Sequence, residues 1–384
     1  ADLAERLKGA GLAARVIAEA NIRTPENANA VLGAGRADLV SIVRGQIADP
    51  HLMAKVQEDR IEDIRGCLSC NQQCWGRRGR DYYISCLINP SVGHEYLWGG
   101  DRFAPAPDRK TILVVGAGPA GLEAARVAAE RGHLITLAEA SSDLGGQFRL
   151  AGLQPRRAQI TDLLAWYGRQ LEKLGVDLRF NTYLDAGDIV GFGADEVVLA
   201  TGSLPVGTGF QKALPMVPDM PGVNAGNVWS TEDVMGRAAR LGKAVIVLDE
   251  GGHWRGVGTA WHLLEAGHAV TIVTPDAMVG KELSRTASDF PARQRLAQLG
   301  ARFVTESAIT EWIGDGARCV SLLTGKEEVI AADSLILATG NRADHELADR
   351  LRAMGQRPTL IGDAQAPRLA SAAIHEGRTA GLAL

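Results

Sequence analysis

The feature that most constrains the fold is a glycine-rich turn between a predicted strand and a predicted helix. The strand TILVV (residues 111–115) runs directly into the turn GAGPAG, and residues 119–132 follow with a helical pattern. This is GxGxxG in the context that dinucleotide binding requires, because its glycines let the backbone approach a pyrophosphate and the helix N-terminus offers free amides. We therefore predict a nucleotide fold that holds a pyrophosphate at Gly116, Gly118, Pro119, Ala120 and Gly121.

A carboxylate follows at the distance expected for a ribose contact. A second strand is predicted at residues 134–138, and Glu139 stands at its end, 18 residues past Gly121. An acid at this place can accept from a ribose 2′-OH, whereas a 2′-phosphate calls for an arginine. The first half is thus expected to take FAD, ADP or NAD rather than NADP.

Three strand-end turns favour a flavin-binding fold over a simple dehydrogenase. The predicted strands at 196–200 and 334–338 each end in Ala-Thr-Gly, and a Gly-Asp pair follows the strand TLI near the C-terminus. Each turn alone is ordinary, but the three in this order indicate one cofactor approached from two sides. The candidate contacts are Thr201, Gly202, Gly362 and Asp363.

A second nucleotide fold is predicted from residue 243 onward, but it lacks the complete GxGxxG motif. A strand at 244–249 is followed by Gly252 and Gly256 but not by GxGxxG, and Trp254-Arg255 would crowd a pyrophosphate. The helix is expected over 258–266, with strands at 269–273, 302–305 and 317–323 and a final helix from Arg368. We interpret this half as a degenerate NAD(P)-type fold kept for packing.

Four of the five cysteines fall within 20 residues, with the spacing C-x2-C-x3-C-x11-C. Such a cluster in a chain that reads as cytoplasmic indicates metal rather than a disulfide framework. Three ligands in eight residues and a fourth apart suit a [4Fe–4S] cluster better than a zinc ribbon, although zinc and no metal remain alternatives. The candidate ligands are Cys67, Cys70, Cys74 and Cys86, whereas Cys319 is expected to be a buried apolar residue.

Length, charge and composition exclude several classes of protein. The 384 residues exceed one typical domain, and the net charge of −4 argues against a nucleic-acid surface or a polybasic membrane patch. No run of 18 apolar residues and no signal-peptide layout occurs, which predicts a cytoplasmic protein without a membrane partner. Before the cysteines, strands at 14–20 and 38–43, a helix at 24–35 and a helix near residue 49 suit a parallel sheet.

Taken in this order, the cysteine segment, a linker at residues 99–109 and GAGPAG resemble the C-terminal part of the multidomain iron–sulfur flavoproteins. That family includes trimethylamine, dimethylglycine and histamine dehydrogenases and 2,4-dienoyl-CoA reductase. The stretch CLSCNQQCWG…SCLINPSVGHE carries the resemblance most specifically, and LGGQ (with Gly146 and Gln147) and IGDAQAPR add to it. The resemblance implies an α/β chain that comprises the end of a TIM-type FMN barrel, a [4Fe–4S] segment and two tandem Rossmann-like domains.

The expected organisation follows from this resemblance. The last two βα units of the barrel would span 1–60, the cluster segment 61–98 and a linker 99–109. An FAD- or ADP-binding domain would take 110–240 and 330–384, with the degenerate domain at 241–329. Arg44 would bind the FMN phosphate beside the loop 21–23, since barrel phosphate sites use the last two loops. Only about 60 residues precede the cluster where a barrel needs roughly 250, so no substrate-handling residue is assigned.

The same resemblance leaves three functions open. We favour oxidative demethylation of a methylated amine, with electrons passing from FMN to [4Fe–4S] and on to an electron-transferring flavoprotein. The alternatives are an NADPH-dependent dienoyl-CoA or enoate reductase and a non-catalytic electron-transfer subunit. The segment GGHWRG, which lacks GxGxxG, favours amine demethylation over the reductase. The family habit predicts a homodimer or larger assembly.

Overall fold

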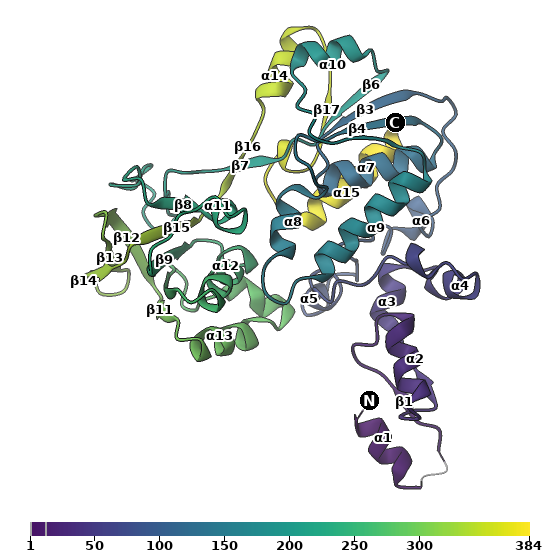
Figure 1. Ribbon diagram of the computed structural model, residues 1–384, viewed down its shortest axis with the longest axis horizontal. Coiled ribbons are helices and arrows are strands. Elements are labelled where there is room, and N and C mark those ends of the chain that lie inside the picture. Colours follow the sequence, from purple (N-terminus) through teal and green to yellow (C-terminus); the bar gives the residue numbers. More distant parts are fainter. Residues whose placement is uncertain (1, 12–13) are drawn as a thin grey trace.

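Two five-stranded parallel sheets form the body of the protein, and a narrow N-terminal segment extends from it (Figure 1). The computed structural model describes residues 2–11 and 14–384. The first sheet has the strand order β17-β6-β3-β4-β5. Its strands are β3 (Thr111–Val115), β4 (Leu134–Ala138), β5 (Asp177–Arg179), β6 (Glu196–Leu199) and β17 (Thr359–Leu360).

Helices cover both faces of the first sheet, as expected when successive residues of a buried strand point to opposite sides. Ile112 and Val114 pack with α7 (Pro119–Glu130), α9 (Gln159–Lys173) and α15 (Ala370–Ala383). Leu113 and Val115 pack on the opposite side. That side is covered by α10 (Ala186–Phe192) and α14 (Glu346–Ala353).

The second sheet has the order β11-β10-β9-β15-β8 and is also parallel. Its strands are β8 (Val228–Ser230), β9 (Ala244–Asp249), β10 (Ala269–Val273), β11 (Arg302–Val304) and β15 (Ser334–Ala338). One face carries α11 (Thr231–Met235), α12 (Trp254–Glu265) and α13 (Asp289–Gln298). The other face carries the antiparallel strands β12 (Ser307–Trp312), β13 (Gly316–Ser321) and β14 (Glu327–Ala331). Cys319 on β13 is 1% exposed, which confirms that it is a core residue.

Two short antiparallel strands join the units (Figure 1). They are β7 (Ser203–Pro205) and β16 (Asn341–Ala343). Because β8 and β15 belong to the second sheet, the second unit runs from about 206 to 340, not from 241 to 329 as the sequence pattern suggested. The expected boundaries ignored β8, whose three residues carry no apolar alternation, and assigned β15 to the wrong sheet.

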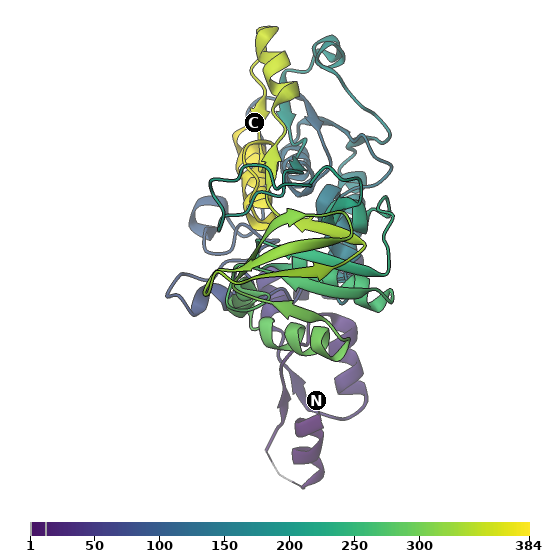
Figure 2. The ribbon, with the colours of Figure 1, turned by 90° about the vertical axis from the view of Figure 1, so that its left-hand side faces the viewer.

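The N-terminal segment contains α1 (Asp2–Gly9), β1 (Ile17–Ala18), α2 (Pro25–Gly33), β2 (Leu39–Val40), α3 (Val43–Ala48) and α4 (Leu52–Gln57). It projects away from the second unit, which faces the viewer in Figure 2. As the Thr-Pro pair predicted, the Thr24 side chain caps α2 and Pro25 is its first residue. The expected strand at 38–43 is shorter, however, because β2 ends at Val40 and Val43 already begins a helix.

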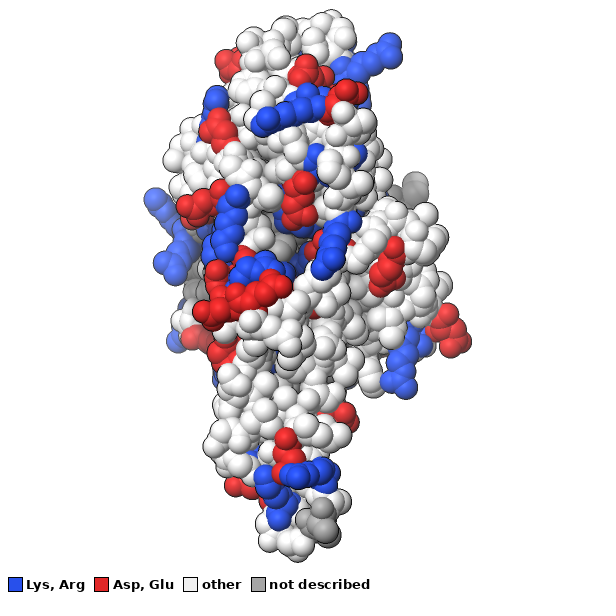
Figure 3. Space-filling view, turned by 90° about the vertical axis from the view of Figure 1, so that its right-hand side faces the viewer, with Lys and Arg blue, Asp and Glu red and all other residues white. Residues whose placement is uncertain are grey.

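The cysteine segment is irregular, with η1 (Ile61–Asp63), α5 (Trp75–Arg78) and α6 (Glu95–Trp98). Further short helices are α8 (Gly146–Gly152), η2 (Lys281–Thr286) and η3 (Gly362–Ala364). Acidic and basic side chains are interspersed over the face seen in Figure 3. No helix among residues 2–11 and 14–384 is both long and apolar enough to cross a membrane.

Candidate functional site

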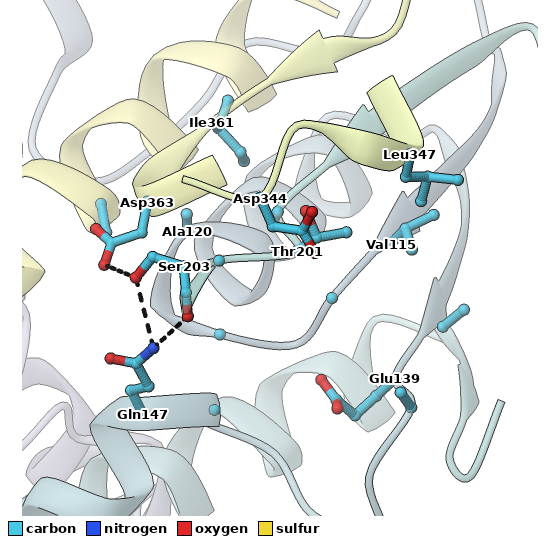
Figure 4. Close-up of a pocket in the computed structure, with 18 of the residues that line it drawn as sticks. Val115, Ala120, Glu139, Gln147, Thr201, Ser203, Asp344, Leu347, Ile361 and Asp363 are labelled. Carbon is cyan, nitrogen blue, oxygen red and sulfur yellow. Dashed lines mark hydrogen bonds between the residues drawn. The ribbon is translucent and has the colours of Figure 1, made fainter. Parts of the chain in front are cut away.

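A cavity of about 550 Å³ opens at the carboxyl ends of the first sheet's strands (Figure 4). Parallel sheets bind ligands at this edge, where strand ends and helix N-termini converge. Ten of the twelve residues predicted to hold an adenine cofactor line it: Gly116, Gly118, Pro119, Ala120, Glu139, Gly146, Gln147, Thr201, Gly202 and Asp363. The other two, Gly121 and Gly362, do not line it, and a Cβ on either would lie within 3 Å of Gly116 or Ala120.

The glycine turn is held by two close backbone approaches. Gly116 has φ +102°, and a Cβ there would meet the Ala200 carbonyl oxygen at 2.4 Å. A Cβ on Gly121 would lie 1.9 Å from the Gly116 oxygen. No side chain caps the N-terminus of α7 at Gly118, so its first amides are left for a ligand. This arrangement fits a pyrophosphate.

Glu139 follows β4 at the cavity's edge, and its carboxylate is held in place by three hydrogen bonds. Oε2 accepts from the Ala117 amide at 2.8 Å, and Oε1 accepts from the amide and the hydroxyl of Ser141, each at 2.8 Å. The side chain is half-buried beside the glycine turn. A carboxylate fixed in this position can accept from a ribose hydroxyl.

A hydrogen-bonded group of polar side chains forms the other end of the cavity. Gln147 on α8 donates through Nε2 to the Ser203 carbonyl oxygen at 2.6 Å, and the Ser203 hydroxyl donates to Asp363 at 3.0 Å (Figure 4). Asn341 donates to both Gln147 and Ser203 at 3.0 Å. Sequence analysis missed Ser203 and Asn341, although each comes next after a predicted Ala-Thr-Gly turn.

A second cavity of about 650 Å³ adjoins the first. The two share a wall made of Gln147, Phe148, Ala151, Asp363, Arg368 and Ala370. The second cavity continues to Cys70 of the cysteine segment and to Trp254 of α12. It also contains Arg157, whose guanidinium lies 4.9 Å from the Trp254 ring and whose pKa burial lowers to about 10.

The four clustered cysteines all line one small cavity, which shares Leu68, Cys70, Gln73 and Leu87 with the second one. Burial raises the pKa of Cys70 to about 12 and that of Cys86 to about 11, and neighbouring thiols add to both shifts. Such thiols are neutral at pH 7 and become thiolates when a metal binds. Within the described ranges 2–11 and 14–384, no three His, Cys, Asp or Glu side chains have the arrangement of a metal-ion site.

Arg44 lies beside the cysteines and apart from the two larger cavities. It donates through Nη1 to the Asn71 side chain at 2.7 Å, between Cys70 and Cys74 in the sequence. Arg23 of the loop 21–23 donates to the Cys67 carbonyl oxygen at 2.8 Å. The two residues expected beside an FMN phosphate therefore contact the cysteine segment in this structure.

A buried ionic network ties the cysteine segment to the first unit. Asp101 pairs with Arg65 at 2.9 Å and with Arg378 at 2.7 Å, and Arg378 also reaches Glu123 at 2.7 Å. Despite burial, the surrounding guanidinium groups hold the pKa of Asp101 well below its ordinary value. Asp101 lies in the stretch 99–109, which was expected to be a plain linker. Its side chain is part of this network, a contact of which composition carried no sign.

The family described as pyridine nucleotide-disulphide oxidoreductase matches residues 110–359. The N,N-dimethylglycine/sarcosine dehydrogenase of Chromohalobacter salexigens is 36% identical over 380 residues, which cover 96% of this chain and 54% of that protein. The NADH oxidase of Thermoanaerobacter brockii is 35% identical, with 91% of this chain and 52% of that protein covered. The chain thus spans about half the length of these relatives.

Among solved structures, histamine dehydrogenase from Rhizobium sp. 4-9 superposes with a TM-score of 0.90 at 30% identity. The match covers 97% of this chain and 58% of that one. It includes both sheets and the segment before them.

Proposed function

Because the chain belongs to the pyridine nucleotide-disulphide oxidoreductase family and is homologous to the nucleotide-binding part of the amine dehydrogenase flavoproteins, we propose that it serves in oxidative amine demethylation. Flavin-dependent redox chemistry is common to that group. The residues that line the first cavity would hold the adenine half of the cofactor, with Glu139 on the ribose and the α7 N-terminus on the pyrophosphate.

The cofactor is FAD rather than ADP in this proposal. An ADP would need only the first cavity, whereas a flavin ring needs a second chamber beyond the pyrophosphate. The adjoining cavity of about 650 Å³ supplies one, and Gln147 and Asp363 border both. Bound FAD would supply reversible two-electron redox chemistry, and Phe148 and Ala151 would give its ring an apolar wall.

The single observation that carries the electron path is the place of Cys70. This cysteine lines the same cavity as Gln147 and Asp363, so a cluster held by Cys67, Cys70, Cys74 and Cys86 would border the flavin chamber. Four cysteine side chains in one cavity are the donor set that an iron–sulfur cluster takes, and a cluster would carry single electrons. Burial and the hydrogen bond from the Ser69 amide to the Cys67 sulfur, at 3.4 Å, would help to set its potential.

The remaining parts of the proposal lie at the N-terminal end. Arg44 would bind the phosphate of FMN in a barrel to which residues 1–60 contribute, beside the cysteine loop it already contacts. Electrons from a small methylated amine would pass from FMN to the cluster and then to an electron-transferring flavoprotein. The relative that acts on N,N-dimethylglycine or sarcosine suggests the substrate class. We also propose a homodimer or larger assembly.

One observation favours a second candidate. The NADH oxidase relative is nearly as similar as the demethylating one, which keeps an NAD(P)H-dependent enoate reductase as the alternative. In that case electrons would enter at the nucleotide units and leave through FMN.

An anaerobic titration of the full-length holoprotein separates the two. Absorbance of flavin and cluster is followed while dimethylglycine, sarcosine, NADH or NADPH is added in turn. Bleaching by a methylated amine and none by the nucleotides is expected. Prompt bleaching by NADH or NADPH alone would establish the reductase instead.

The cluster assignment is tested by Cys74→Ala. The expected result is loss of the cluster's visible absorbance and iron content with the adenine cofactor still bound, because Cys74 lines only the cysteine cavity. Cys319→Ala is the matched control, since that thiol lies in the core of the second unit. An unchanged iron content in Cys74→Ala would remove Cys74 from the ligand set.

A further inference from the structure

The two units repeat one strand–turn–helix pattern, and the sheet register aligns them residue by residue. Val115 pairs with Leu199, just before Ala200-Thr201-Gly202. Leu248 pairs with Leu337, just before Ala338-Thr339-Gly340. Val115 and Leu248 are therefore equivalent positions. The residues that follow them, Gly116 and Asp249, are equivalent too.

The Asp249 carboxylate occupies the turn itself. Its Oδ1 accepts from the amides of Gly251 and Gly252 at 3.2 and 3.0 Å, and the residue is 1% exposed. A Cβ on Gly256, the third residue of α12, would lie 2.5 Å from this carboxyl group. In the first unit the third residue of α7 is Gly121, and it packs against the backbone of Gly116 instead. A side-chain carboxylate thus takes up two glycine amides of this turn, where the first unit has only the backbone of Gly116.

The second unit also lacks an acid at the position that Glu139 occupies in the first unit. Val115 pairs with Ala138 and Leu248 pairs with Val273, so the equivalent of Glu139 is Thr274. Thr274 is fully buried and has no carboxylate. The nearest acid along the chain, Asp276, is paired with Lys281 at 2.8 Å.

Acidic groups also lie beside Asp249, although arginines line the second cavity next to this turn. Arg255 donates to Glu232 at 2.9 Å, to Thr231 at 2.8 Å and to the Thr339 carbonyl oxygen at 2.8 Å, so three of its five N–H groups are already engaged. Glu250 and Asp276 face the same loop, and both raise the pKa of Asp249 in addition to its burial. A diphosphate brought here would meet like charge at short range.

We propose that Asp249 replaces the dinucleotide phosphate, so that the second unit binds no pyridine nucleotide at this turn. The family implies such a ligand, and the residues present do not fit it. The inference concerns the second unit alone and does not depend on which amine is the substrate, whereas the reductase alternative would require the opposite.

The test uses the purified holoprotein, with the first unit filled by its own cofactor. NADH, NADPH and inorganic pyrophosphate are titrated against wild type, Asp249→Gly and Asp249→Asn by calorimetry. The expected result is no saturable binding of any probe to wild type up to about 1 mM, and saturable binding of pyrophosphate to Asp249→Gly. In Asp249→Asn the side chain still fills the turn, so no binding is expected there. This variant also controls for anions held by the arginines of the second cavity.

Each other outcome contradicts the proposal. Saturable binding of NADH or NADPH to wild type, with shifted amide resonances of ¹⁵N-labelled Gly251 and Gly252, would overturn it. A folded Asp249→Gly variant that binds no pyrophosphate would overturn it too, as would equal binding in all three proteins. If Asp249→Gly does not fold, the wild-type titration and the glycine resonances still decide the question.

Discussion

Glu139 and Asp249 are carboxylates at the glycine turns of the two units, but their surroundings differ in how far they leave room for a ligand. Glu139 is half-buried at the edge of a cavity, where its oxygens accept from Ala117 and Ser141 and remain beside open space. Asp249 is fully enclosed, and its second oxygen has no hydrogen-bond partner. One position is suited to receive a ligand, and the other is already filled.

Removal of the Glu139 carboxylate should weaken cofactor binding. Glu139→Ala is expected to cost about 1–3 kcal/mol of binding free energy, because a charged acceptor of a ribose hydroxyl is lost. Glu139→Gln, which keeps an acceptor at nearly the same place, should cost less. Equilibrium dialysis of FAD against apoprotein measures both. An Ala variant with unchanged FAD affinity would remove Glu139 from the site.

Asp249 should make stability depend on pH. Burial raises its pKa to about 7, so the folded protein holds a proton that the unfolded chain releases near the ordinary value of 3.8. The free energy of unfolding should therefore fall as pH rises from about 4 to about 7. Asp249→Asn lacks this proton, and its stability relative to wild type should improve over that range by up to about 4 kcal/mol. Urea unfolding at several pH values checks this, and parallel profiles would contradict it.

At the scale of elements, α7 and α15 pack at unusually close range, which brings the C-terminal helix against the cofactor cavity. A Cβ on Gly377 would meet the Ala120 carbonyl oxygen at 2.3 Å, and one on Gly381 would meet the Val127 Cβ at 2.8 Å. These glycines are one helical turn apart on one face of α15. Asp363 lies in η3, just before this helix, so the contact also positions the polar end of the cavity.

Gly377→Ala should therefore destabilise the protein by about 1–3 kcal/mol, the range for an overpacked contact that must shift backbone. Gly168→Ala in α9 is the matched control, because a Cβ there meets only a Leu144 methyl at 3.5 Å. That change should be neutral or stabilising by up to about 1 kcal/mol, since alanine is the better helix former. Thermal unfolding of both variants compares them. Equal effects would mean that the close approach of α15 does not matter.

At the scale of the whole molecule, the buried network around Asp101 joins three distant parts of the chain. Arg65 lies just before the cysteines in the sequence, Glu123 lies in α7, and Arg378 lies in the last helix. Arg378→Met should cost about 3–5 kcal/mol of stability, because Asp101 and Glu123 would lose a buried partner. Arg352→Met is the control, since its pair with Asp349 is exposed and should contribute at most about 1 kcal/mol. Denaturant unfolding measures the difference, and similar losses would show that the network contributes little.

Much of the first unit was predictable because its signals are local. The strand at 111–115, the helix after GAGPAG and the strand at 134–138 lie where their patterns indicated. The prediction for the second unit was less accurate, since α12 begins at Trp254 and not near residue 258. The expected start ignored that Asp249 can satisfy the loop amides itself, which lets the helix begin early.

Local sequence alone determined the glycine turn, the place of Glu139 at the end of the next strand and the cysteine spacing, because each depends on residues close together in the chain. Only the tertiary structure decided which strands share a sheet, that Ser203 and Asn341 meet Gln147, and that Asp101 and Arg378 form a buried pair. These are contacts between residues far apart in sequence, and a buried charge reveals itself only when its partner is in place. The same holds for Asp249, which resembles an ordinary strand-end acid until the register of the two sheets aligns it with Gly116.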